Sequence, residues 1–310
     1  MLRTPVRVWL AALYDRMYSV RSQANLEHLT MNLSVAGFLL HLALVFLARN
    51  LSQPAAIVVA AGKNYLAAIY TPFSVILFYE VLMLIAALPQ STTQSIAKQY
   101  QIVSLIVVRR FFKDIAELND LGKLVQFSPE VLPVFMDMLA GLLMFLLVTV
   151  FMHAARRRAV PDPHEEESSE IKKFISRKKA ISVGLTVLLV SLAAFSGWEF
   201  ANELYQELYH GAKAHLDPNT LFYTEVFSVM IFADVLIVIL SLAVSDSYEL
   251  VFRNGAFVIS TILIRLSLTV PRSFASALAI TGMVFGILTL LIYNYHVRVR
   301  LGDRAEPMPT

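Results

Sequence analysis

Four charged side chains interrupt stretches of sequence that are otherwise apolar. Glu80 and Arg109 lie in the first half of the 310-residue chain, and Asp234 and Arg265 lie in the second half. A lone charge at the centre of a bilayer costs about 2.5–3.5 kcal/mol on insertion scales, so an acid and an arginine at similar depth are expected to pair. Arginine can also donate two parallel hydrogen bonds to one carboxylate. We therefore predict two intramembrane ion pairs, Glu80 with Arg109 and Asp234 with Arg265.

These pairs could serve either of two roles. As structural pins, they would fix the register of neighbouring helices, because buried ion pairs can add specificity without adding much stability. As part of a polar pathway, they would line a route for an ion or a small solute. The first half also carries polar residues that have no counterpart at matching positions in the second half, and a pathway would use them: Arg110, Lys113 and Asp137.

Patterns typical of catalysis or metal binding are missing from the sequence. The chain has no cysteine, which excludes disulfides, thiolate metal sites and cysteine nucleophiles. No glycine-rich phosphate loop, His-Glu-x-x-His motif or nucleophile–base set can be recognised. We therefore predict no enzymatic activity, no catalytic residue, no cofactor and no metal site. His41 lies within an apolar stretch, where a packing role is commoner than a proton relay.

The composition indicates what surrounds these charges. The chain is 57% hydrophobic and only 16% charged, with a mean hydropathy of +0.63. Soluble domains are on average about 45–50% apolar and about 25% charged, so a lipid bilayer must cover much of this chain. The net charge of +3 is too small and too scattered to indicate nucleic-acid binding. Six apolar stretches approach the length needed to cross a membrane, at residues 31–48, 73–88, 131–153, 181–198, 221–244 and 274–295.

Two further apolar stretches contain charges, and the distribution of basic residues decides whether they span. They are residues 102–118, with Arg109, Arg110 and Lys113, and residues 256–270, with Arg265. Lysine and arginine cluster near the N-terminus, in a central linker and near the C-terminus. If both stretches span, all three basic clusters lie on one side, as the positive-inside rule requires. We therefore predict a multi-pass protein of the inner (plasma) membrane, with both termini in the cytoplasm.

The two halves of the sequence resemble each other. Residues 70–75 are similar to residues 223–229, and residues 104–109 are similar to residues 260–265. The acids and arginines of the two predicted ion pairs occupy corresponding positions. We predict an all-α, polytopic membrane helix bundle with about eight transmembrane helices, built as two tandem four-helix repeats. The predicted regions are a cytoplasmic amphipathic segment (1–30), the first repeat (31–153), a charged cytoplasmic linker (154–179), the second repeat (180–297) and a cytoplasmic tail (298–310).

Two of these regions allow more than one interpretation. Within the N-terminal segment, residues 8–20 fit an amphipathic helix on the membrane surface or a lead-in helix packed on the bundle. The linker fits a solvated hinge or a docking segment. Gly282 and Gly286 form a Gly-x-x-x-Gly pattern, which allows close helix contact within the bundle or between subunits.

Two classes of function are compatible with this architecture. The first is a transporter or channel for an ion or a small solute, using the interface between the repeats. The alternative is a non-transporting accessory or scaffold subunit of a larger membrane complex. The lipid bilayer is the predicted partner in both cases, together with a membrane-protein partner or a second copy of the chain. A water-accessible cavity that reaches Glu80, Arg109 or Asp137 would favour transport.

Overall fold

The described part of the chain consists of helices. The computed structural model describes residues 4–51, 58, 65–117, 132–156, 169–210, 218–242 and 248–305. Within these residues there are nine α-helices: α1 (Thr4–Met17), α2 (Val20–Asn50), α4 (Ala67–Ala87), α5 (Thr92–Glu117), α7 (Leu132–Arg156), α8 (Ser169–His210), α9 (Pro218–Leu242), α10 (Tyr248–Thr269) and α11 (Arg272–Ala305). The predicted all-α class is confirmed.

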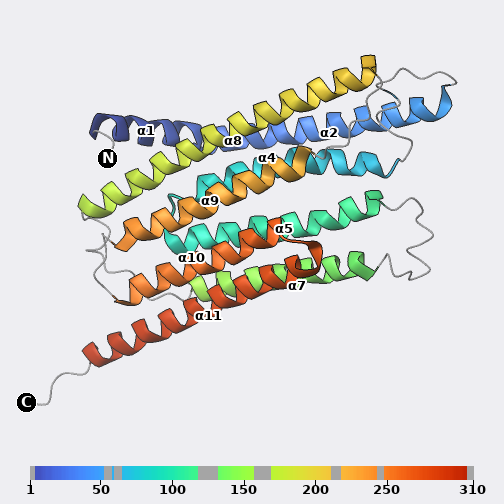
Figure 1. The fold of residues 1–310 in the computed structure, drawn as a ribbon. Coiled ribbons are helices and arrows are strands. Elements are labelled where there is room, and N and C mark those ends of the chain that lie inside the picture. Colours follow the sequence, from blue (N-terminus) through green and yellow to red (C-terminus); the bar gives the residue numbers. More distant parts are fainter. Residues whose placement is uncertain are drawn as a thin grey trace, which may run out of the picture.

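The long helices form two layers (Figure 1). In the first layer α2, α4, α5 and α7 contact one another in that order, and in the second layer α8, α9, α10 and α11 do the same. The layers touch where α4 meets α8, α5 meets α10 and α7 meets α11. Because successive helices run in opposite directions, one end of the bundle holds Thr4, Arg156, Ser169 and Ala305. We call this the linker end, and the opposite one the far end.

The apolar helices identify a multi-pass membrane protein. Among the described residues, five helices are long and apolar enough to cross a membrane, namely α2, α7, α8, α10 and α11. A shorter apolar segment, Thr71–Ala87, lies within α4. The charged stretch around Arg265 therefore belongs to a helix of spanning length and composition. The stretch around Arg109 lies in α5, which is not among the five because polar residues occupy its first turns and charged residues its second half.

Helices continue through two of the boundaries expected from the sequence. The predicted end of the N-terminal segment at residue 30 falls inside α2, which already begins at Val20. The predicted linker, residues 154–179, includes the last turn of α7 and the first turns of α8. Residues 157–168 of that linker lie outside the described residues. These helical turns could not be recognised from the sequence because they are polar. A helix that projects beyond the apolar part of the bundle needs no apolar stripe.

The helix α1 packs on the bundle at the linker end. The Tyr14 hydroxyl donates to the Ala86 carbonyl at 2.5 Å, and the Tyr18 hydroxyl lies 2.6 Å from Thr186 Oγ1. Burial raises the pKa of Tyr14 to about 12, so this hydroxyl keeps its proton and can donate even in mildly alkaline solution. Lys179 Nζ lies 2.6 Å from the Asp15 carboxylate. These contacts fit the alternative in which residues 8–20 form a lead-in helix packed on the bundle. Trp9 on the same helix remains exposed.

Gly282 and Gly286 of α11 allow close contacts inside the chain. A Cβ on Gly282 would lie 2.9 Å from Ile264 Cγ1 of α10, and a Cβ on Gly286 would overlap the Tyr100 hydroxyl of α5. That hydroxyl lies 2.5 Å from Ser260 Oγ, so it bridges the two layers. The Gly-x-x-x-Gly pattern therefore acts within the bundle.

Candidate functional site

The first charged pair joins α4 to α5. The Arg109 guanidinium forms an ion pair with the Glu80 carboxylate, and the two side chains are 11% and 9% exposed. Arg109 Nε also donates to the Leu105 carbonyl at 3.3 Å, and Nη1 donates to the Phe73 carbonyl at 3.4 Å. The guanidinium is thus held by one carboxylate and two backbone carbonyls.

The second charged pair joins α9 to α10 and is more deeply enclosed. Arg265 Nη1 lies 2.8 Å from Asp234 Oδ2, and the two side chains are 1% and 5% exposed. Arg265 Nη2 donates to Gln99 Oε1 of α5 at 3.1 Å. Because Gln99 belongs to the first layer, this pair is buried at the interface between the layers. The structure therefore brings together the residues of each pair that the sequence analysis expected.

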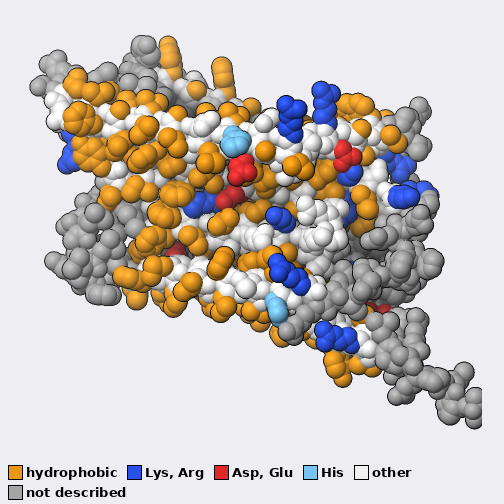
Figure 2. Space-filling view, turned by 180° about the vertical axis from the view of Figure 1, so that it is seen from behind, with side chains coloured by type: hydrophobic (Ala, Val, Ile, Leu, Met, Phe, Trp, Pro, Cys, Tyr) orange, Lys and Arg blue, Asp and Glu red, His pale blue; other side chains and the backbone are white. Residues whose placement is uncertain are grey.

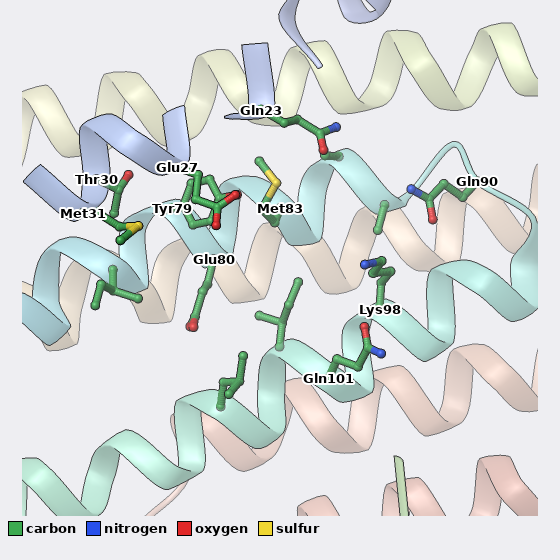
Figure 3. A pocket seen from close by; sticks show the side chains of 15 residues that line it. Gln23, Glu27, Thr30, Met31, Tyr79, Glu80, Met83, Gln90, Lys98 and Gln101 are labelled. Atoms are coloured by element: carbon green, nitrogen blue, oxygen red, sulfur yellow. The ribbon is translucent and has the colours of Figure 1, made fainter. Parts of the chain in front are cut away.

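A cavity of about 450 Å³ opens beside the first pair, on the outer face of the first layer. Figure 2 shows this outer face, where basic side chains gather toward the linker end, at the right. The cavity is lined by polar side chains from three helices: Gln23, Glu27 and Thr30 of α2; Tyr79 and Glu80 of α4, with Gln90 after it; and Lys98 and Gln101 of α5. Glu80 points from α4 toward α5 (Figure 3). The cavity thus extends from the linker end to the Glu80 carboxylate.

Apolar side chains complete the cavity wall. They come from the same three helices and include Met31, Ile76, Met83, Ile102 and Leu105. A mostly apolar wall with a few polar groups is typical of sites for small molecules, which commonly measure about 300–1,000 Å³. The carboxylate of Glu80 can accept from a cationic group, and the guanidinium of Arg109 beside it can donate to an anionic one.

Of the three other residues expected in a polar pathway, Arg110 and Asp137 do not line this cavity. Arg110 Nη2 donates to the Ser267 carbonyl of α10 at 3.1 Å. Asp137 is buried in α7 and accepts from Ser276 Oγ of α11 at 3.2 Å. Both residues lie toward the far end, near the end of α5 and the start of α7. The side chain of Lys113 lies outside the described side chains.

His41 and Lys178 make helix-to-helix contacts. His41 Nδ1 lies 2.6 Å from Thr71 Oγ1 and joins α2 to α4. Lys178 Nζ, on a side chain buried in α8, donates to the Gln90 carbonyl at 2.8 Å. Sequence reasoning missed Gln99, Lys98, Glu27 and Lys178, because none of them interrupts an apolar stretch in the way that Glu80 does. Among the described residues, no group of three or more His, Asp or Glu side chains could hold a metal ion.

Comparison with protein-family models, with curated proteins and with solved structures finds no match for this chain. A functional assignment therefore rests on the geometry of the described residues. That geometry supplies one charged pair whose acid, Glu80, lines a cavity, and a second charged pair enclosed between the layers.

Proposed function

We propose that this chain is a membrane transporter for an ion or a small polar solute, and that the solute binds in the cavity between α2, α4 and α5. The observation that carries the proposal is the path of the cavity, which runs from the linker end to the Glu80–Arg109 ion pair. A charged pair at the wall of such a cavity is the kind of intramembrane site that transporters use for binding.

Solute binding at this site would act on the contact between two helices. A cationic group would compete with Arg109 for the Glu80 carboxylate, and an anionic group would compete with Glu80 for the guanidinium. In either case the ion pair between α4 and α5 loosens when the solute binds. This coupling gives the solute a means to change the relative position of the two helices, which transport requires.

The architecture that we propose has eight spanning helices in two tandem repeats. Three features of the structure support it. Consecutive helices contact one another in the same order in both layers. Each ion pair joins the second helix of a layer to the third. Finally, a glycine of the fourth helix meets the residue just before the arginine in both layers: a Cβ on Gly141 would lie 2.9 Å from Val108, and one on Gly282 would lie 2.9 Å from Ile264.

We also propose that the linker end faces the cytoplasm. The basic residues around the linker and near both termini belong to this end, and basic loops favour the cytoplasmic side. The cavity would then open toward the cytoplasm. The proposed binding site lies in the first repeat rather than between the repeats. The pair between the layers, Asp234–Arg265, is enclosed by Gln99 and is therefore not open to a solute.

The second candidate is a non-transporting accessory subunit. The contact of Gln99 with Arg265 favours it, because a buried polar contact between layers resists the relative motion that transport needs. In that case the cavity would bind without releasing its occupant on the other side of the membrane.

Reconstitution of the full chain into proteoliposomes tests the transport proposal. Currents on a solid-supported membrane would be recorded during jumps of Na⁺, K⁺, H⁺, Cl⁻, phosphate, ethanolamine and glycine. We expect a current with at least one of these probes, reduced at least tenfold by Glu80→Gln. The matched control is Glu225→Gln, which changes an exposed acid on α9. Folded protein that gives no current with any probe would overturn transport in favour of the accessory role, and a current insensitive to Glu80→Gln would overturn the site.

A further inference from the structure

A stripe of polar side chains runs along the outer face of α2. Arg21, Asn25, His28 and Asn32 are all exposed and follow one another at intervals of four, three and four residues. At 100° per residue these intervals place them within roughly 60° of one another on one side of the helix. The opposite side carries Ser34, which is buried and donates to the Pro72 carbonyl of α4 at 3.3 Å. The stripe therefore points away from the bundle.

The depth of the stripe follows from the contacts between α2 and α4. Ser34 lies beside Pro72, and Gln23, Glu27 and Thr30 line the same cavity as Tyr79, Met83 and Ala86. The first turns of α2 are therefore level with the segment Thr71–Ala87, which is the apolar part of α4. The stripe thus lies at the depth of an apolar helix, with Leu29 and Leu33 exposed beside it.

Amide and imidazole groups at this depth need hydrogen-bond partners. Lipid chains offer none, and side chains of Asn and His are among those that join helices within membranes. The amides of Asn25 and Asn32 each supply both donors and an acceptor, and a neutral imidazole supplies one of each. An identical amide at the same depth can both donate to and accept from such an amide, and two facing imidazoles can share one N–H···N bond.

We propose that the stripe is covered by a second copy of this chain, with α2 packed in parallel against α2. Two copies inserted in the same orientation are related by a two-fold axis along the membrane normal, which places each stripe residue opposite its own counterpart. The three- and four-residue spacing is that of two helices in continuous contact. Arg21, at the linker end of the stripe, extends its long side chain toward the headgroups rather than toward its counterpart. This dimer does not depend on the transport proposal.

Cysteine cross-linking can test the dimer. The chain contains no cysteine of its own, so each disulfide between two copies must come from the introduced cysteine. Asn25→Cys and Asn32→Cys would be oxidised in native membranes and examined for disulfide-linked dimers. The matched controls are Leu33→Cys and Leu40→Cys, at side chains that are 52% and 64% exposed on the same helix. At 100° per residue they lie roughly 60–100° around the helix from Asn25 and Asn32. We expect at least fivefold more dimer from the two stripe positions than from the controls.

Equal cross-linking at all four positions, no cross-linking at the stripe, or an adduct with a different protein would each overturn the proposal. Co-purification of two differently tagged copies provides a second measurement. We expect the double variant Asn25→Leu/Asn32→Leu to lower co-purification at least fivefold, while Leu33→Ala leaves it at the level of the original chain. Undiminished co-purification of the double variant would show that the stripe is not the interface.

Discussion

The two ion pairs have the same placement in their layers but different surroundings. Both join the second helix of a layer to the third. Glu80–Arg109 lies at the wall of a cavity on an open face, whereas Asp234–Arg265 is covered by Gln99 from the other layer. The same chemistry is thus accessible in one layer and enclosed in the other.

The environment of an intramembrane ion pair, and not its residue types, therefore decides what the pair can do. The enclosed pair has lost its water and depends on its partners, so it is suited to fixing how the layers meet. The pair at the cavity retains access to a ligand or to water, so it is suited to binding. Substitutions at the two sites should therefore have different consequences.

The largest effect is expected from Asp234→Ala. It leaves Arg265 charged and without its carboxylate between the layers, which should lower the free energy of unfolding by about 3–5 kcal/mol. Thermal unfolding of the purified protein in detergent measures the loss. The double variant Asp234→Ala/Arg265→Leu should recover part of it. A single variant as stable as the original chain would show that the pair does not hold the layers together.

Gln99→Leu should have the next largest effect, because it removes the acceptor of Arg265 Nη2. Loss of a hydrogen bond to a buried charged group should lower stability by about 2–3 kcal/mol. Gln101→Leu is the matched control, since Gln101 is half-buried and lines the cavity. If both variants lose the same stability in the unfolding assay, the enclosure by Gln99 does not distinguish the two pairs.

Gly286→Ala tests the contact between layers at a second position. The added methyl group would overlap the Tyr100 hydroxyl, and overpacking of this kind costs about 1–3 kcal/mol. Combining it with Tyr100→Phe, which removes that hydroxyl, should restore part of the stability. The control is Gly184→Ala, where a Cβ would meet nothing within 4 Å. Equal melting temperatures for the two glycine variants would contradict the predicted overlap.

The smallest loss of stability is expected from Glu80→Ala. Because Glu80 forms part of the cavity wall, its removal opens the cavity toward Arg109 and lets water reach the remaining guanidinium. The cost should then fall to about 1 kcal/mol, well below that of the enclosed pair. The double variant Glu80→Ala/Arg109→Ala should accordingly show little coupling in the same unfolding assay. A loss as large as that of Asp234→Ala would mean that this pair is also a structural pin.

The apolar stretches and the charges within them could be predicted from the sequence, because the bilayer imposes simple rules on length and charge. The cost of a lone charge in hydrocarbon sufficed to match Glu80 with Arg109 and Asp234 with Arg265. The all-α class followed from the same constraint, since backbone groups inside a membrane must bond within their own helix or barrel.

The surroundings of each pair could not be predicted, because they depend on which helix covers which face. Gln99 lies next to Tyr100 and carries no pattern that marks it as a partner of Arg265. The cavity needs the side chains of three helices, and its α2 wall comes from turns that the sequence placed in a cytoplasmic segment. Tertiary packing therefore determines which of two similar pairs remains accessible.

The contacts at the linker end also set an order in which the molecule can be completed during its synthesis. Tyr18 bonds to Thr186, Asp15 to Lys179, and the Gln90 carbonyl to Lys178, so α1, the turn after it and the turn after α4 are all joined to α8. When the ribosome has translated the chain only as far as Arg156, none of these partners exists. A nascent chain that ends there is consequently an unfinished structure, and α1 can take its final place only after α8 has been made.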